Sequence, residues 1–403
     1  MVSPAADPSV PVRSISASPV NATGRERPRI ATVLIGIGAS GTERRMACVF
    51  EHLTRRHPGR HLLVVNRELL DVLLSAGFRL GPPDIHVLEN RSVLDRKEGA
   101  HSGLLTNVGR LATLLSYRRE IARVCRSLHI KVVQAFLEMV PVLGLWPIPG
   151  VTQVASLVSH LPKYYDGRSF SSRLLSASLR NYRHIDALYE GIAEGLIGME
   201  IPREKISHPA WSCVGHTRFH PEPKRDIVSS TGRAFTFKRP DLMLRAAKLV
   251  HSRANHVRFY VLGRGPLMKR LIDMAHRSGS DEWLTVTYMP DPSQIVNQSR
   301  VHVCVEEFDN VTNQSLLEGL AAGCAIVASD VGYTGRVVAP DVGILVPLQP
   351  EAIADAVLSL INRPDTLDAM GQAARRKVLR NHSIDQYLDY LTGVLNSNLS
   401  VPE

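Results

Sequence analysis

Two series of short apolar runs constrain the fold of this chain more than any other feature of the sequence. The first series comprises residues 31–37 (ATVLIGI), 61–66 (HLLVVN), 131–137 (KVVQAFL) and 152–158 (TQVASLV). The second comprises residues 227–231 (IVSST), 257–262 (VRFYVL), 301–305 (VHVCV) and 325–329 (AIVAS). Amphipathic stretches such as residues 42–57 and 240–254 separate the runs. Runs of this kind are typical of parallel strands buried on both faces, so the pattern predicts an α/β fold with two Rossmann-like, doubly wound domains.

The length and the termini indicate how the chain is divided. At 403 residues it is long enough for two domains of ordinary size. Residues 1–28 are rich in Ser, Pro, Ala and Arg and lack the apolar core of a secretory signal, so we expect a disordered leader there. We expect an N-terminal domain over residues 29–220 and a C-terminal domain over residues 221–383. A helix and tail at 384–403 are expected to pack back toward the N-terminal domain.

Charge is unevenly distributed between the two halves. Residues 1–220 contain 28 Lys and Arg against 18 Asp and Glu, whereas residues 221–403 contain 20 of each, so the first half carries the whole net charge of +10. This asymmetry suggests an anionic partner for the N-terminal domain, which could be nucleic acid, a membrane surface or an acidic acceptor. The five cysteines form no C-x-x-C pair, which is typical of reduced thiols in a cytosolic protein.

Two segments of the first half raise the question of membrane contact. Residues 139–162 contain no Asp, Glu, Lys or Arg, but several Pro and Gly residues interrupt them, so we expect a strand, a turn and a second strand rather than a membrane span. Residues 107–129 place apolar side chains, from Val108 and Leu111 to Val124, at helical spacings. We expect this apolar face to pack on the sheet and to leave a basic edge that could touch anionic lipid. The basic residues of this helix are Arg110, Arg118, Arg119, Arg123 and Arg126.

A glycine-rich turn follows the first predicted strand. Gly36, Gly38 and Gly41 fit the pattern G-x-G-x-x-G, which brings backbone N–H groups close to a dinucleotide pyrophosphate or simply makes a tight strand-to-helix turn. A nicotinamide enzyme would also place an acidic residue at the end of the second strand. Here that strand ends in Asn66 and Arg67, so support for a nicotinamide oxidoreductase is weak.

Two cations follow the first strand of the second domain. Arg233 comes directly after Gly232, and Lys238 lies five residues further on, before a predicted helix. Cations at this edge of a parallel sheet could stabilise the charge that develops on a leaving diphosphate, although two solvated surface cations are the simpler explanation.

Three further segments favour the functional interpretation. They are VLGRGPLMKRL, which contains Gly263, the stretch from Asp309 to Gly332, in which Glu318 is expected to open a helix, and GILVP with the two helical patterns after it. In order and spacing they resemble the C-terminal half of the family-four retaining glycosyltransferases of the GT-B fold. The resemblance extends over residues 30–395 and is densest from Gly232 to Arg380.

The resemblance implies roles for particular residues. The S-G-T-E-R sequence at 40–44 is similar to the turn that the family places beneath the donor diphosphate, which would put Gly41 there. His160 would lie near the acceptor and the sugar, and Glu318 would bind the nucleotide ribose. The family has a second glutamate eight positions before this one, near the donor sugar. That position is Asn310 here, with Asp309 beside it, so the identity of the sugar is open.

Three polar residues in the same loop have two possible roles. They could offer donors to sugar hydroxyls or phosphate, or the loop could simply cap the helix at Ser315. These residues are Thr312, Asn313 and Gln314.

The activity implied by the resemblance is transfer of a sugar, with retention, from a UDP- or GDP-linked donor to a glycan, lipid-linked or small-molecule acceptor. The resemblance implies neither a cofactor nor a metal, and the sequence has no cluster with metal-ligand spacing. We expect a cytoplasmic protein, peripheral on the inner membrane face. A GT-B sugar-nucleotide epimerase is the nearest alternative enzyme. The non-enzyme alternative is a basic protein that binds nucleic acid or a membrane surface. The sequence contains no nucleic-acid-binding motif, so we expect no nucleic-acid partner.

Overall fold

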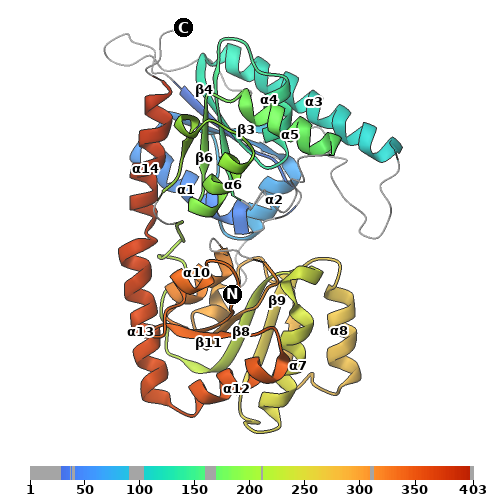
Figure 1. Ribbon diagram of the computed structural model, residues 1–403, viewed down its shortest axis with the longest axis vertical. Helices are drawn as coiled ribbons and strands as arrows, with labels where there is room; N and C mark the ends of the chain where they lie inside the picture. The colour runs from blue at the N-terminus through green and yellow to red at the C-terminus, as the bar shows by residue number, and fades with distance from the viewer. Residues whose placement is uncertain are drawn as a thin grey trace, which may run out of the picture.

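A computed structural model describes residues 29–36, 38, 41–89, 104–158, 169–209, 212–308 and 313–399. These residues form two α/β domains, one above the other in Figure 1, each built on a parallel sheet. The predicted fold class, two Rossmann-like doubly wound domains, is therefore confirmed.

The N-terminal domain alternates strands and helices from the start of the described chain. Its elements are β1 (Arg29–Leu34), α1 (Gly41–Arg56), β2 (His61–Asn66), α2 (Arg67–Ser75), β3 (Ile85–Leu88), α3 (Leu104–Ser127), β4 (Ile130–Phe136), α4 (Met139–Leu145), β5 (Thr152–Leu157), α5 (Phe170–Arg180), β6 (His184–Ala187), α6 (Glu190–Gly198) and β7 (Ile206–Ser207).

The C-terminal domain repeats the alternation. Its elements are β8 (Arg225–Arg233), α7 (Pro240–His251), β9 (Arg258–Arg264), α8 (Met268–Arg277), β10 (Leu284–Thr287), α9 (Ser293–Val296), β11 (Ser299–Cys304), α10 (Gln314–Ala321), β12 (Ala325–Ser329), α11 (Thr334–Val337), β13 (Gly343–Val346), α12 (Pro350–Ile361) and α13 (Pro364–Asn381). Helix α14 (Ile384–Ser397) follows.

Both sheets have the strand order of a dinucleotide-binding fold. The first is β3-β2-β1-β4-β5-β6-β7 and the second β10-β9-β8-β11-β12-β13. Helices cover both faces, so every residue of β2 and β12 is buried, as the apolar runs predict. The order reverses between β1 and β4 and again between β8 and β11, and ligands of such sheets bind at the carboxyl ends of the strands where this reversal occurs.

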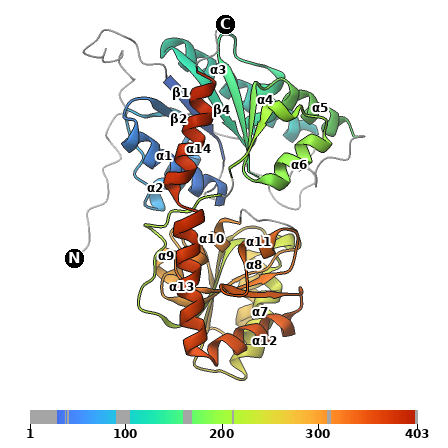
Figure 2. The same cartoon turned by 60° about the vertical axis from the view of Figure 1, so that its left-hand side comes forward.

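The last two helices form a strap along both domains. Helix α13 lies on the C-terminal domain and α14 crosses to the N-terminal domain, where it lies in front of β1 and β2 in the second view (Figures 1 and 2). Tyr390 of α14 donates a hydrogen bond to Asp186 of β6 at 2.7 Å. Arg60, just before β2, donates to Asn396 at 2.6 Å. The C-terminal helix thus belongs to the packing of the domain in which the chain begins.

Two expectations for the N-terminal domain are wrong. Residues Met139–Leu145 form helix α4 instead of a strand, since a short apolar run does not distinguish a buried helix from a strand. Gly144 allows this helix to approach α5 closely, because a Cβ at Gly144 would overlap the backbone of Ser178. Within the described ranges, none of the helices combines the length and the apolar character that a membrane span needs.

The second wrong expectation concerns α3. Its C-terminal half packs as predicted, with Ile121 and Val124 buried, but Val108 and Leu111 are 57% and 44% exposed. The outward face of α3 therefore has apolar residues in its first half and basic ones in its second.

Candidate donor-binding site

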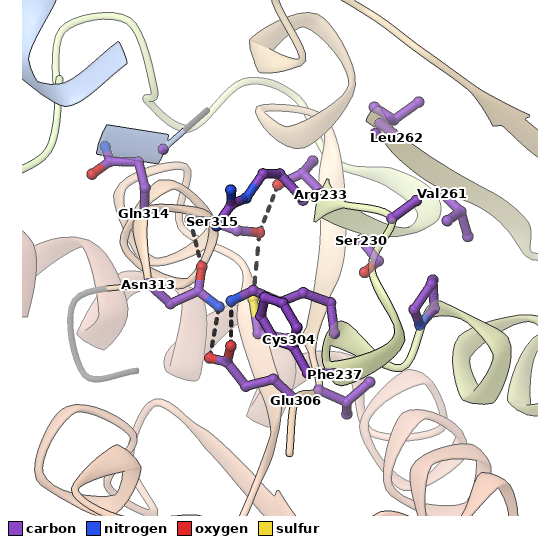
Figure 3. Close-up of a pocket in the computed structure, with 18 of the residues that line it drawn as sticks. Ser230, Arg233, Phe237, Val261, Leu262, Cys304, Glu306, Asn313, Gln314 and Ser315 are labelled. Carbon is purple, nitrogen blue, oxygen red and sulfur yellow. Dashed lines mark hydrogen bonds and ion pairs between the residues drawn. The ribbon is translucent and has the colours of Figure 1, made fainter. Parts of the chain in front are cut away.

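One cleft of about 370 Å³ lies between the two domains. Its walls come from the carboxyl ends of β8, β9 and β11, the first turn of α10, and the first turn of α1 in the other domain (Figure 3). Seven of the residues expected at a donor site line it. They are Gly41, Gly232, Arg233, Lys238, Gly263, Asn313 and Gln314.

The two predicted cations approach the cleft from the segment between β8 and α7. Arg233 ends β8, and its exposed guanidinium lies 5.1 Å from the centre of the Phe235 ring. Lys238 ends a 3₁₀ turn, after which Pro240 begins α7 with its ring at the first helical position. The Lys238 side chain is only 16% exposed and forms an ion pair with Glu306. Both cations are thus placed at the switch point of the second sheet, as predicted.

Glycines bring the backbone of two loops together at this edge. Gly232 has a φ of 153°, a conformation that disfavours side chains, and a Cβ at Gly263 would overlap the carbonyl oxygen of Gly232. Gly41 performs the same function between domains, because a Cβ there would lie 2.7 Å from the Cβ of Gln314. Close approach of α1 to α10 thus depends on the missing side chain of Gly41.

Glu306 is a site residue that the sequence pattern did not single out. It follows β11, is 5% exposed and holds both Lys238 and the side-chain amide of Asn313, which donates to its Oε1 at 3.0 Å (Figure 3). A possible signal was present, since Glu306 is the first polar residue after the apolar run 301–305 at a strand end next to the switch point.

Glu318 occupies a different position from the expected one. It lies in the middle of α10 rather than at its start, because the helix begins at Gln314, where Asn313 accepts a hydrogen bond from the Ser315 N–H at 3.0 Å. Both Glu318 oxygens accept from Arg44 of α1, at 2.6 and 2.7 Å. Burial raises the pKa of this carboxyl and Arg44 opposes the rise. Glu318 faces a small neighbouring cavity rather than the main cleft.

A second contact between α1 and α10 supports the ion pair. The buried Arg45 donates to the side chain of Gln314 at 2.8 Å. At a separate place, Tyr333 of the C-terminal domain donates to Glu194 of α6 at 2.6 Å. Polar side chains therefore connect the two domains at more than one place.

The glycine turn after β1 is closed by an amide. Asn66 accepts a hydrogen bond from the Gly36 N–H at 3.0 Å and donates to the Gly36 carbonyl at 2.8 Å. At the end of β2, where a nicotinamide enzyme would place an acidic residue to bind the adenosine ribose, this chain has Asn66, whose side chain is already bound to the glycine turn.

Four expected site residues lie outside the described part of the chain. They are His160, Asp309, Asn310 and Thr312. Their roles stay predictions. Among the described residues, no three His, Cys, Asp or Glu side chains are grouped as a metal ion would require.

Comparison with solved structures identifies the same architecture. The structure of HepE from Anabaena in complex with UDP and glucose superposes with a TM-score of 0.71 at 14% identity, covering 92% of this chain and 100% of that one. At this identity the likeness shows the fold, which is that of a two-domain GT-B protein.

The sequence comparisons find similarity to glycosyltransferases. Residues 225–363 match the family described as glycosyl transferases group 1, which confirms the predicted resemblance. A poly(ribitol-phosphate) alpha-N-acetylglucosaminyltransferase of Staphylococcus aureus is 23% identical over an alignment that covers 45% of this chain and 38% of the length of that enzyme. A D-inositol 3-phosphate glycosyltransferase of Rhodococcus opacus is 29% identical over an alignment that covers 44% of this chain and 43% of the length of that enzyme. The chain thus matches about two fifths of each relative.

Proposed function

We propose that this protein transfers a sugar from a UDP- or GDP-linked donor to a glycan, lipid-linked or small-molecule acceptor, with retention and without a metal ion. The observation that carries the proposal is the placement of Arg233 and Lys238 with the first turn of α10 around one cleft at the switch point of the second sheet. The names of both curated relatives describe glycosyltransferases, which supports this chemistry.

In the proposed reaction, the bond between the anomeric carbon and the diphosphate oxygen breaks first. Negative charge grows on the departing diphosphate, where the Arg233 fork and the Lys238 ammonium stabilise it in place of a metal ion. The first turn of α10 lines the same cleft, and the positive end of the helix dipole adds to this field. The acceptor oxygen then attacks the same face of the sugar, and its proton passes to the departing phosphate oxygen.

Lys238 can add a phosphate oxygen to its existing partner during this cycle. Its ammonium is paired with Glu306, and Asn313 holds the other oxygen of that carboxylate. An ammonium has three N–H donors, so Lys238 can bind a phosphate oxygen while Glu306 keeps it aimed into the cleft. Glu306 thus acts by positioning a cation that is otherwise flexible.

The acceptor is assigned to the N-terminal domain, which carries the excess of positive charge. An anionic or lipid-linked glycan suits this charge, and His160 would lie beside it. The outward face of α3, with Val108 and Leu111 exposed in one half and Arg119, Arg123 and Arg126 in the other, suits peripheral contact with an anionic inner leaflet. No nucleic-acid partner is proposed.

A screen of nucleotide sugars tests the donor assignment. A true donor at a hundredfold excess over its dissociation constant should stabilise the folded protein by about 2.7 kcal/mol, which a thermal shift detects. The matching acceptor reaction should give a product whose anomeric configuration, read by NMR, equals that of the donor sugar. Turnover of a nucleotide sugar to its epimer without any acceptor would instead identify an epimerase. Absence of stabilisation by every UDP- and GDP-sugar would refute the proposal.

A further inference from the structure

A histidine in the core of the C-terminal domain is connected to the wall of the cleft. His302 lies in β11 between Val301 and Val303 and is fully buried. Both ring nitrogens have partners, since Nδ1 lies 2.9 Å from the Ser229 hydroxyl and Nε2 lies 2.9 Å from the Ser315 hydroxyl. Ser229 belongs to β8, and Ser315 belongs to the first turn of α10.

The fold makes room for this ring. A Cβ at Gly319 would lie 2.6 Å from the His302 Cδ2 atom, so the helix has no side chain at the point where the ring approaches it. A glycine inside a helix makes the helix less stable than an alanine would. Burial lowers the pKa of His302 to about 3, with a smaller contribution from the Lys224 charge. The ring is therefore neutral at ordinary pH, with one nitrogen donating and the other accepting.

The partners of the ring determine which nitrogen carries the proton. The buried Ser229 hydroxyl has His302 as its one hydrogen-bond partner among the described residues. A buried hydroxyl proton without an acceptor is costly, so Ser229 donates to Nδ1. The proton of the neutral ring is then on Nε2, which donates to the Ser315 oxygen.

Ser315 is thereby left with its own proton to donate. The Thr231 hydroxyl lies 2.6 Å away and either oxygen of this pair can be the donor, so one of the two hydroxyl protons is left over. When Thr231 donates, the Ser315 proton is the one left, and its nearest further acceptor among the described residues is the weakly accepting Cys304 sulfur at 3.5 Å (Figure 3). Ser315, Thr231 and Cys304 all line the cleft that also contains Arg233.

We propose that His302 is a positioning residue of the donor site, which turns the Ser315 hydroxyl proton into the cleft to donate to a phosphate oxygen of the bound nucleotide. This inference rests on the proposed function. In the opposite tautomer, Nε2 would accept a hydrogen bond from the Ser315 hydroxyl. Ser315 would then present only its oxygen lone pairs to the anion. The hydrogen bonds from Ser229 to His302 and from His302 to Ser315 thus favour an anionic ligand without adding a charge to the site.

Calorimetry with a nucleoside diphosphate and its nucleoside, UDP with uridine and GDP with guanosine, isolates the diphosphate contact. Ser315→Ala and His302→Leu should each lower affinity for the diphosphate about tenfold, the effect of one hydrogen bond to a charged group, and leave the nucleoside unaffected. His302→Gln, whose amide N–H reaches close to the position of Nε2–H, should recover most of the loss. In the Ser315→Ala background, His302→Leu should have little further effect.

The outcomes separate the two proposals. If the folded wild-type protein binds neither UDP nor GDP, the proposed function fails and this inference fails with it. If it binds one of them and the His302 and Ser315 variants keep the wild-type ratio of diphosphate to nucleoside affinity, only the positioning role is wrong. Equal losses for both ligands would show a general packing role and also overturn the inference. Should His302→Leu not fold, Ser229→Ala keeps the ring but removes the donor that fixes its tautomer, and it should lower the same ratio by a smaller factor.

Discussion

Arg44 of α1 and Glu318 of α10 join the two domains through a two-fold hydrogen-bonded ion pair, with one guanidinium nitrogen 2.6 and 2.7 Å from the two carboxylate oxygens. Glu318 is 1% exposed. The carboxylate expected to bind the donor ribose is therefore held by the opposite domain. If a nucleotide binds Glu318 as expected, this pair must open or share its oxygens, which would couple donor binding to the contact between the domains.

Removing the charge of one member of this pair should destabilise the folded protein more than removing the charges of both. Arg44→Ala leaves a buried, unpaired carboxylate and should destabilise the protein by about 3 kcal/mol, the lower end of the range for a broken buried ion pair. Arg44→Ala with Glu318→Gln removes the charge as well and should recover much of the loss. Thermal unfolding of the single and double variants measures the difference. A double variant as unstable as Arg44→Ala would contradict a role for the buried charge.

Gly41 and Gly38 provide a matched pair of substitutions in the same turn. Gly41→Ala introduces a Cβ 2.7 Å from Gln314, so it should push α1 and α10 apart and weaken donor binding by tenfold or more. At Gly38 the nearest atom to the new Cβ would be the flexible end of Arg264, at 3.5 Å, so Gly38→Ala should bind donor normally. Titration with the donor found in the screen compares the two. Equal effects would mean that the interdomain contact does not govern binding.

Substitutions of Arg233 and Lys238 should lower the rate of sugar transfer more than they weaken donor binding. Either alanine variant should lower kcat by about 10²–10³, because each removes a cation aimed at charge that grows in the transition state. Lys248→Ala on the exposed side of α7 changes the same charge far from the cleft and serves as the control. Steady-state kinetics on folded variants measures the effect, and wild-type turnover by Arg233→Ala or Lys238→Ala would remove these residues from the catalytic group.

Asp186 should make stability depend on pH. It is buried, accepts hydrogen bonds from Ser156 and Tyr390, and has a pKa raised by burial from 3.8 to about 6. The folded chain therefore holds this proton more tightly than the unfolded chain. The stabilisation is complete below about pH 4 and is lost as the pH rises to about 6, a change on the order of 3 kcal/mol.

Asp186→Asn removes this titration. Relative to wild type, the variant should gain stability between pH 4.5 and 7, as measured by urea unfolding at both values. Asp341→Asn, at an exposed position before β13, should show no such gain. A pH-independent difference between wild type and Asp186→Asn would show that Asp186 keeps the same protonation state throughout this range.

The basic half of α3 should determine any preference for anionic membranes. Changing Arg119, Arg123 and Arg126 to Gln should abolish flotation with vesicles containing anionic lipid, since each basic residue near such a surface contributes about 1 kcal/mol. The same substitution of Lys269, Arg270 and Arg277 on α8 removes an equal charge from the other domain and should leave flotation unchanged. Equal binding of the wild-type protein to neutral and anionic vesicles would argue against the proposed surface.

The sequence predicts the architecture well because buried parallel strands are read directly from continuous apolar runs. All eight runs correspond to strands, and Gly232, Arg233 and Lys238 reach the expected edge because strand ends at a switch point have a defined place in such sheets. The same reasoning fails for α4, where length and composition are compatible with either helix or strand. It also fails for Val108 and Leu111, whose helical spacing does not reveal which face of α3 is covered.

The contacts within the site depend on pairs far apart in sequence. Glu306 is important because the end of β11 lies beside Lys238, 68 positions earlier in the chain. The Arg44–Glu318 pair spans 274 positions and crosses the domain boundary. No local pattern in the sequence encodes such partners. The sequence therefore identifies which residues bring charge to the cleft, while the structure is needed to show what each charge is paired with.

The crossing of α14 to the first domain also affects how the two domains can be separated experimentally. A fragment ending near residue 220 would contain every strand of the first sheet but would lack Tyr390 and Asn396, the partners of Asp186 and Arg60. Its apolar surface beneath α14 would be open to water and prone to self-association. An isolated N-terminal domain for acceptor-binding studies should therefore be designed with residues 384–399 joined to it by a linker or supplied as a separate peptide.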